Sequence, residues 1–245
     1  MQLISPNKKL FGLIYGMSGS GKTHLAATYA LWHPETPVLL VDADQGSETL
    51  EAKEFAKCDN LFVVSFDTFK DLDECYNLCK VNTVENWCKA IPELRGKLTK
   101  PFGCIIWDTW TEIQWTFSSQ LRKDKGILGK GLTYRDNMQI QHWGQITDLN
   151  KLAVSSFKDL SIECLFLMQA EIKEDATTHT LVKGPSIHGK LVTELPAMFT
   201  TVIYTYNTPK GGWSATTLPK LGWPAKVRGR EGKDMENPTL EALLK

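Results

Sequence analysis

Residues 16–23 of the chain read Gly-Met-Ser-Gly-Ser-Gly-Lys-Thr and fit the pattern G-x-x-x-x-G-K-[ST] of a phosphate-binding P-loop. Glycines let the backbone turn so tightly that successive N–H groups point at the phosphates. Lys22 supplies a positive charge for the β- and γ-phosphates, and the Thr23 hydroxyl is placed to ligate Mg²⁺. The motif predicts a site for ATP and Mg²⁺ with the contact residues Gly16, Ser18, Gly19, Ser20, Gly21, Lys22, Thr23 and His24.

The residues on either side of this motif supply the structural context that a P-loop needs. The apolar run 10–15 predicts a strand before it, and the alanine-rich stretch 24–32 predicts a helix after it. The start of a helix adds the positive end of its dipole to an anion site. This context favours a nucleotide site over the alternative, a chance glycine-rich turn.

Two acidic positions follow apolar runs and are candidates for chemistry beside the phosphates. A P-loop needs a second carboxylate that holds Mg²⁺ through water, and Asp108 follows four apolar residues as such an acid does. The alternative for Asp108 is a cap on the helix that begins at Thr109. Asp44 can polarise the water that attacks the γ-phosphate. Alternatively, Asp42 and Asp44 end their strand and cap a helix that begins near Ser47.

A neutral side chain, Gln169, follows the apolar residues 165–168. An amide at the tip of a strand can hydrogen-bond a γ-phosphate, or its attacking water, and report hydrolysis to the segment that follows. We therefore take Lys22, Asp44 and Gln169 as candidate catalytic residues, and Thr23 and Asp108 as candidate metal ligands.

The elements that must position these residues alternate along the chain. Strands are predicted at 37–41, 61–66, 102–107 and 162–168, and helices at 69–91, 109–122 and 138–157. This alternation predicts an α/β fold with a mostly parallel, doubly wound sheet. Residues 200–206 and 213–218, joined by a turn, predict an antiparallel hairpin at the sheet edge. No repeat or linker interrupts the pattern, so a single domain over 1–245 is expected.

Composition limits the class of protein. The chain has 245 residues, 42% of them hydrophobic, and its 28 basic and 28 acidic side chains cancel. A neutral total argues against a constitutively basic nucleic-acid coat protein but allows a local basic patch. No signal sequence or transmembrane run is visible, so we expect a cytoplasmic protein with reduced thiols.

Cys104 and Cys164 lie in apolar strands and are expected to be buried. Cys75, Cys79 and Cys88 have no histidine at ligand spacing, which argues against zinc.

Taken in order, these motifs resemble the core of the RecA-type recombinases. That family has a P-loop first, then an acid after an Asp-Ala pair, then a strand ending in Asp and a strand ending in Gln. Here the three later motifs are 41–44, 105–108 and 167–169. The resemblance gives Asp44 the place of the catalytic glutamate, one methylene shorter, and Gln169 that of the γ-phosphate switch. It covers roughly residues 10–206 and implies a RecA-like P-loop NTPase fold.

The chain looks most like the short RecA-like ATPases of bacteriophages, some of which anneal single strands. The segment 183–190, with the apolar residues after it, adds to that likeness. The resemblance implies that 122–135, a basic loop that includes Tyr134, is a first DNA-binding loop, although an ordinary solvated loop is the common alternative. It implies a second at 170–187, where the mixed charge alone supports no DNA contact.

Further cations and aromatic residues remain as candidates for contacts between subunits. Lys190, Lys226, Arg228 and Arg230 could each reach the nucleotide of a neighbouring subunit, although a surface charge is the commoner role for any one of them. Trp107, Trp110, Trp115 and Trp143 are interpreted as core or interface aromatics.

The expected function is that of a Mg²⁺-dependent ATPase that binds single-stranded DNA and promotes annealing or strand exchange in phage recombination. It would act as a homo-oligomer, a ring or a filament, in the bacterial cytoplasm, with a single-strand-binding protein as a candidate partner and no membrane contact. Two alternatives stay open: a P-loop kinase of a small phosphoryl acceptor and a nucleotide-gated adaptor. The sequence does not choose between ring, filament and monomer.

Overall fold

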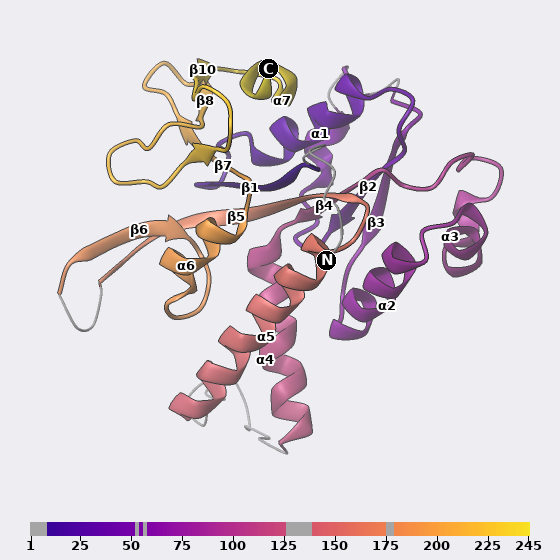
Figure 1. Ribbon diagram of the computed structural model, residues 1–245, viewed down its shortest axis with the longest axis horizontal. Coiled ribbons are helices and arrows are strands. Elements are labelled where there is room, and N and C mark those ends of the chain that lie inside the picture. The colour runs from indigo at the N-terminus through magenta and orange to yellow at the C-terminus, as the bar shows by residue number, and fades with distance from the viewer. Residues whose placement is uncertain (1–8, 52–53, 56–57, 126–138, 175–178) are drawn as a thin grey trace, which may run out of the picture.

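A long, twisted sheet forms the centre of the computed structural model, which describes residues 9–51, 54–55, 58–125, 139–174 and 179–245 (Figure 1). The main path of the sheet runs in the order β10-β8-β7-β1-β5-β4-β2-β3. Six neighbouring strands of this path are parallel: β7 (Thr201–Asn207), β1 (Phe11–Gly16), β5 (Glu163–Glu174), β4 (Cys104–Asp108), β2 (Val38–Asp42) and β3 (Leu61–Ser65). Their carboxyl ends therefore meet at one edge, where ligands bind in open α/β sheets.

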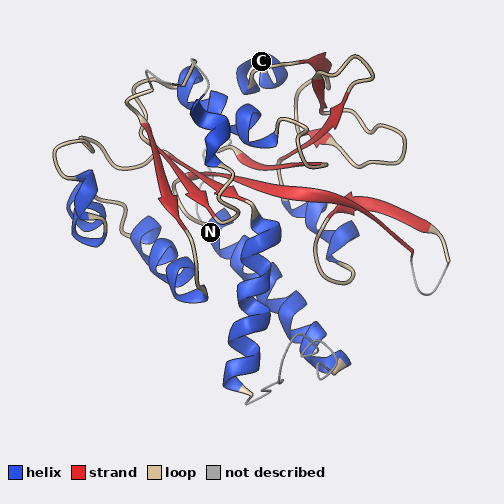
Figure 2. Ribbon diagram, turned by 180° about the vertical axis from the view of Figure 1, so that it is seen from behind, coloured by secondary structure: helices blue, strands red, loops and turns tan. Residues whose placement is uncertain are grey.

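Helices cover both faces of the sheet (Figure 2). Alternate residues of each strand point to opposite faces, so Ile14 packs in one apolar cluster while Leu13 and Tyr15 pack in the other. The Ile14 cluster contains α1 (Lys22–Trp32) and α7 (Leu240–Leu244). The other contains α2 (Phe69–Lys80), α3 (Val84–Ala90), α4 (Trp110–Asp124), α5 (Ile140–Lys158) and α6 (Leu191–Met198). The predicted α/β, mostly parallel, doubly wound class is confirmed.

The region 69–91 was predicted as one continuous helix, and this prediction was wrong because the region forms two helices. α2 ends at Lys80, and α3 begins after Thr83, whose Oγ1 accepts a hydrogen bond from Asn86 N at 3.3 Å. A threonine that satisfies a free N–H in this way favours a new helix start over continuation. Two short 3₁₀ helices, Ser47–Glu51 and Pro92–Leu94, complete the helical segments of the described chain.

Antiparallel strands extend the sheet in its C-terminal part, as predicted, and two more strands, β10 and β9, join the predicted hairpin. β7 pairs with β8 (Trp213–Thr216), and β10 (Asp234–Glu236) then pairs with β8 as the edge strand. The two-residue β9 (Lys226–Val227) pairs with the beginning of β7.

The segment 170–187, expected as a loop, is mostly a hairpin arm, which corrects that prediction. β5 continues for five residues beyond Gln169, to Glu174, and β6 (Leu181–Pro185) pairs back along it. Both ribbon views show the arm reaching well beyond the body of the sheet (Figures 1 and 2). The sequence pattern missed it because Glu171, Lys173 and Glu174 make the outer half of the strand as polar as a loop.

Two of the predicted core tryptophans and both cysteines that were predicted to be buried lie in the core. Trp107 and Trp110 are fully buried, and Trp110 Nε1 donates to Asn150 Oδ1 at 3.1 Å, which joins α4 to α5. Cys104 and Cys164 are fully buried free thiols, as predicted. None of the helices described here has the length and apolar character needed to span a bilayer.

Candidate functional site

The turn between β1 and α1 has the backbone shape that its glycines predict. A Cβ on Gly16 would lie 2.1 Å from Thr205 Oγ1 and 2.5 Å from Ser20 Oγ, so only glycine fits there. Gly19 and Gly21 have φ values of +70° and +80°, a region that glycine enters without steric cost. Residues 17–19 are exposed at the crest of the turn. The P-loop is therefore open to a ligand at its crest and tightly packed at its base.

Lys22 lies inside this turn and is 6% exposed. Its Nζ donates to Gly16 O at 3.2 Å, to Met17 O at 2.9 Å and to Gln169 Oε1 at 3.3 Å. Burial lowers the pKa of Lys22, and the neighbouring carboxylates of Asp108 and Asp44 oppose that shift. The ammonium group is thus held over the P-loop by weak acceptors that a phosphate can replace.

Thr23 and Asp108, the two predicted metal ligands, lie next to each other. Thr23 Oγ1 donates to Asp108 Oδ2 at 2.6 Å, and Asp108 is 1% exposed. Burial raises the pKa of Asp108 to about 7, with the Thr23 hydrogen bond opposing the rise and Asp44 and Asp42 adding to it. Within the described part of the chain, Asp108 Oδ1 has no hydrogen-bond partner. A buried, unpartnered carboxylate oxygen beside a hydroxyl suits a hard cation such as Mg²⁺.

Asp42 and Asp44 bring further negative charge to the same edge of the sheet. Asp42 ends β2 in register with Asp108 on β4, and it is 7% exposed. Asp44 is an exposed residue in the following turn, where Gly46 N donates to Asp44 Oδ1 at 3.0 Å and to Asp42 Oδ1 at 3.2 Å. Partial burial of its carboxylate raises the pKa of Asp44, against the Gly46 hydrogen bond, and Asp42 adds to the rise. The structural role at the strand end is thus present alongside any catalytic one.

Gln169 lies within β5 beside the P-loop, because it pairs in register with Gly16, the last residue of β1. Its backbone is fixed on both sides: Gln169 N donates to Thr111 Oγ1 at 2.9 Å, and Gln169 O accepts from Ser186 N at 2.6 Å. Gln114 Nε2 also donates to Ser186 O at 3.0 Å. The base of the β5–β6 arm is therefore tied to the residue of β5 that contacts Lys22.

Three functional contacts were missed at the sequence level. Thr205 Oγ1 lies 2.7 Å from Ser20 Oγ and closes the base of the P-loop, Thr111 holds Gln169, and the Trp213 ring covers Gly21. All three come from distant parts of the chain and belong to no spaced motif. Their only sequence signal is that Thr205 and Trp213 flank the predicted hairpin turn.

His24, predicted among the nucleotide contacts, lies beside the P-loop at the start of α1. Its Nε2 is 3.0 Å from Glu54 Oε1, and its ring stands edge-on to the rings of Phe55 and Trp213 at centroid distances of 5.3 and 5.6 Å. Ser18, predicted in the same set, is exposed at the crest of the turn.

The basic segment 122–135 is only partly a loop. α4 continues to Asp124, and Arg122 is 7% exposed on that helix, so Arg122 is not the surface cation that the prediction required. Residues 126–135, including Tyr134, lie outside the described residues. In the second predicted DNA segment the charges largely pair with each other: Lys173 bridges to Glu171, and His179 to Glu174.

The cations proposed to reach a neighbouring subunit lie away from the P-loop of their own chain. Lys226 Nζ and the Arg228 guanidinium both donate to Ala197 O, at 3.3 and 3.1 Å. β9, which contains Lys226 and ends just before Arg228, pairs with the first residues of β7. These residues lie at the amino ends of the parallel strands, whereas the P-loop follows the carboxyl end of β1. Lys190 is exposed at the start of α6, and Arg230 is exposed in a late turn. The structure brings none of these four to Lys22.

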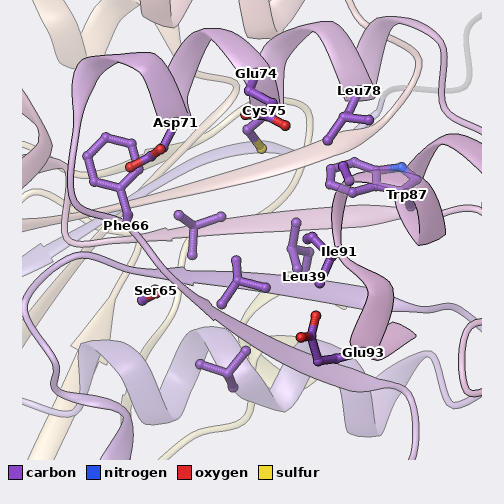
Figure 3. Close-up of a pocket in the computed structure, with 14 residues that line it drawn as sticks. Leu39, Ser65, Phe66, Asp71, Glu74, Cys75, Leu78, Trp87, Ile91 and Glu93 are labelled. Carbon is purple, nitrogen blue, oxygen red and sulfur yellow. The ribbon is translucent and has the colours of Figure 1, made fainter. Parts of the chain in front are cut away.

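A cavity of about 480 Å³ lies elsewhere, between β2, β3 and the helices α2 and α3 (Figure 3). Its walls are apolar, with Leu39 and Trp87 among them, and the carboxylates of Asp71, Glu74 and Glu93 line it as well. None of the P-loop residues lines it. Because negative charge disfavours phosphate, this cavity does not compete with the P-loop as the nucleotide site.

Comparison with known proteins places this geometry in a family. A family model described as an AAA domain matches residues 8–229. No curated protein matches the chain. Among solved structures, the crystal structure of the RadB recombinase is similar to it, with 14% identity, a TM-score of 0.46, and coverage of 93% of this chain and 86% of that chain. The family match spans the P-loop, Asp108 and Gln169, and the chain belongs to the AAA domain family of nucleotide-binding ATPases.

Proposed function

We propose that this protein is a Mg²⁺-dependent ATPase of the RecA-like type whose activity depends on single-stranded DNA, and that it promotes annealing or strand exchange in phage recombination. The observation that carries the proposal is the contact between Lys22 Nζ and Gln169 Oε1 at 3.3 Å. It joins the P-loop to a strand that continues into a projecting arm, so a change at the γ-phosphate has a direct mechanical route to a surface that can meet DNA.

In the proposed reaction, the P-loop amides and the N-terminus of α1 bind the phosphates of ATP. Lys22 turns from Gly16 O and Met17 O to the β- and γ-phosphates. Thr23 and Asp108 would hold Mg²⁺, which supplies charge neutralisation to the phosphate oxygens. The Lys22 charge serves the same end, because phosphoryl transfer depends mainly on positioning and electrostatic stabilisation.

Asp44 is assigned to the attacking water. As the water oxygen bonds to the γ-phosphorus, the bond from that phosphorus to the β–γ bridging oxygen breaks, which leaves ADP and inorganic phosphate. The Asp44 carboxylate orients the water and accepts its proton, a role that suits a carboxylate with a raised pKa. For this role its side chain leaves Gly46 N, to which it is bonded here.

DNA contact is assigned to the basic segment after α4 and to the β5–β6 arm. Residues 122–135 contain five basic side chains and one acidic one. Arg122 is buried on α4, and the other four basic side chains suit a phosphate backbone. We also propose that residues 1–245 form one domain and that copies assemble into a ring or filament, with Lys190, Lys226, Arg228 and Arg230 as candidates for contacts in trans.

The test is steady-state hydrolysis of ATP, with and without single-stranded DNA, by the wild-type protein and by Lys22→Ala. We expect strong stimulation by DNA and a loss of turnover of at least 100-fold in Lys22→Ala, an effect of transition-state charge stabilisation. The matched control is Lys100→Ala, which removes an exposed lysine paired with Glu35 and is expected to turn over normally.

The other outcomes separate the proposal from its rivals. Hydrolysis that ignores DNA would remove the DNA-dependent part of the proposal and leave an ATPase of another role. Phosphate transfer only with an added small acceptor would favour a kinase. Nucleotide binding without any turnover would favour a nucleotide-gated adaptor.

A further inference from the structure

An aromatic side chain from β8, which only β7 separates from β1 in the sheet, lies directly on the P-loop. A Cβ on Gly21 would lie 2.4, 2.7 and 2.8 Å from three atoms of the six-membered ring of Trp213. Three nearly equal distances mean that the ring covers the Gly21 Cα with its face. Trp213 begins β8, and it is partly exposed. An indole therefore forms part of the wall of the proposed nucleotide site.

Trp213, His24 and Phe55 form a row of aromatic rings at the start of α1, called the aromatic row below. The His24 ring is 5.6 Å from Trp213, with an angle of 62° between their planes, and 5.3 Å from Phe55, with an angle of 73°. Glu54 Oε1 lies 3.0 Å from His24 Nε2 and fixes the orientation of the imidazole. The row is thus ordered at the point where the P-loop passes into its helix.

The order of strands shows which end of a nucleotide this row would meet. β4, which ends at Asp108, and β5, in which Gln169 pairs with the last residue of β1, lie on one side of β1. Asp108 and Gln169 mark the proposed metal and γ-phosphate end of the site. β7 and β8, which carries Trp213, lie on the other side of β1. A triphosphate whose γ-phosphate lies at Gln169 therefore runs across the P-loop toward β8. The group beyond its α-phosphate, the nucleoside, reaches the aromatic row.

We propose that Trp213 and His24 form a nucleoside subsite in which the base of a bound purine nucleotide packs against the Trp213 indole. The proposal rests on the nucleotide site proposed above. Aromatic stacking binds any base but favours the larger face of a purine, and loss of one stacking partner costs about 10- to 100-fold in affinity. The subsite therefore contributes affinity and a preference for purines over pyrimidines, while the P-loop binds the phosphates.

The experiment compares ligands that share the phosphates and differ in the nucleoside. Calorimetry measures the affinities of ATP, CTP and inorganic tripolyphosphate, each with Mg²⁺, for the wild-type protein, Trp213→Ala, Trp213→Phe and Trp32→Ala. Trp32 is a partly exposed tryptophan at the other end of α1 and serves as the matched control.

We expect Trp213→Ala to lose about ten-fold or more in ATP affinity, to lose its preference for ATP over CTP and to keep the wild-type affinity for tripolyphosphate. Trp213→Phe should restore part of the ATP affinity, and Trp32→Ala should match the wild type. An equal loss for ATP and tripolyphosphate in Trp213→Ala would overturn the proposal, because it would mean that the indole only supports the shape of the P-loop.

Two outcomes with the wild-type protein distinguish this proposal from the proposed function. Equal affinities for ATP, CTP and tripolyphosphate would overturn the nucleoside subsite and leave the phosphate site intact. Binding of none of the three would overturn the nucleotide site itself and the subsite with it. Quenching of tryptophan fluorescence by ATP that persists in Trp213→Phe would also count against the subsite.

Discussion

The amide oxygen of Gln169 lies 3.3 Å from Lys22 Nζ, so the middle of β5 and the lysine of the P-loop share a hydrogen bond. Two residues further along β5, Glu171 accepts from Ser186 Oγ at 3.0 Å and from Ile187 N at 3.3 Å, where the arm returns to the body. A γ-phosphate competes with Gln169 for the lysine, because a charged acceptor makes the stronger hydrogen bond. We therefore expect nucleotide binding to change a contact at the base of the arm.

The first prediction concerns the coupling that this contact provides. Gln169→Ala should keep the affinity for ATP within about three-fold of the wild-type value, because Lys22 and the P-loop amides supply most of the phosphate binding. The stimulation of hydrolysis by single-stranded DNA should be lost. Titration of DNA into a steady-state hydrolysis assay measures it, and Gln141→Ala, which changes an exposed glutamine on α5, is the control. Normal stimulation in Gln169→Ala would contradict the proposed coupling.

A second prediction separates the proposed catalytic role of Asp44 from its role in the turn. Asp44→Asn keeps an oxygen that can accept from Gly46 N, so the fold and the affinity for ATP should change little. Turnover should fall about 10²- to 10⁴-fold, the range for loss of a general base. Single-turnover hydrolysis checks this against Asp59→Asn, which alters an exposed aspartate. Full activity in Asp44→Asn would leave only the structural role of this carboxylate.

Much of this site could be predicted because its parts are short motifs at strand ends. The strand before the P-loop, Asp108 and Gln169 were all identified from an apolar run followed by one polar residue, since buried parallel strands have that pattern. Trp213 and Thr205 could not be found in this way. These two residues reach the P-loop only because β7 pairs with β1 and β8 pairs with β7. The order of strands in a sheet leaves no local signal in the sequence, so neither contact could be predicted.

The break between α2 and α3 and the β5–β6 arm were missed for a different reason. The apolar residues around Val81 continue a helical pattern, so only the capping contact of Thr83 marks the new start. In the arm, polar residues alternate with apolar ones, and most side chains in its outer part are not buried. The sequence of this segment therefore resembles that of a loop. The stability of the arm comes from pairing along β5 and from contacts such as Lys183 Nζ to Leu221 O at 2.9 Å.

A third prediction follows from the buried carboxylate of Asp108. Burial raises the pKa of this group to about 7 in the folded protein, whereas an exposed aspartate titrates near pH 4. Between about pH 4 and 7 the folded state therefore holds a proton that the unfolded state has released. The free energy of unfolding falls as pH rises through this window, and the loss is complete above the folded pKa.

Urea unfolding in EDTA, at intervals between pH 5 and 8, measures this effect. The wild-type protein should lose on the order of 1–3 kcal/mol more between pH 5 and 8 than Asp108→Asn, whose side chain stays neutral. Mg²⁺ with ATP should restore the wild-type stability at pH 8 and have a smaller effect on Asp108→Asn. Identical pH profiles for the two proteins would show that Asp108 does not titrate in this window.

The last prediction concerns the packing at the base of the P-loop. In Gly16→Ala the new methyl group would lie 2.1 Å from Thr205 Oγ1 and 2.3 Å from Thr205 O, and the backbone oxygen cannot move aside without disturbing β7. Overpacking of this kind costs about 1–3 kcal/mol or more. The same shift should abolish ATP binding, because it displaces the P-loop backbone whose N–H groups are proposed to bind the phosphates.

The matched control is Gly144→Ala, at an exposed glycine within α5 where a Cβ meets nothing within 4 Å. Alanine is the better helix former by about 0.5–1 kcal/mol, so this variant should be slightly more stable than the wild type. Thermal unfolding and ATP affinity measured for both variants test the argument. A Gly16→Ala protein with wild-type stability and ATP affinity would mean that the P-loop yields more easily than its contacts with Thr205 imply.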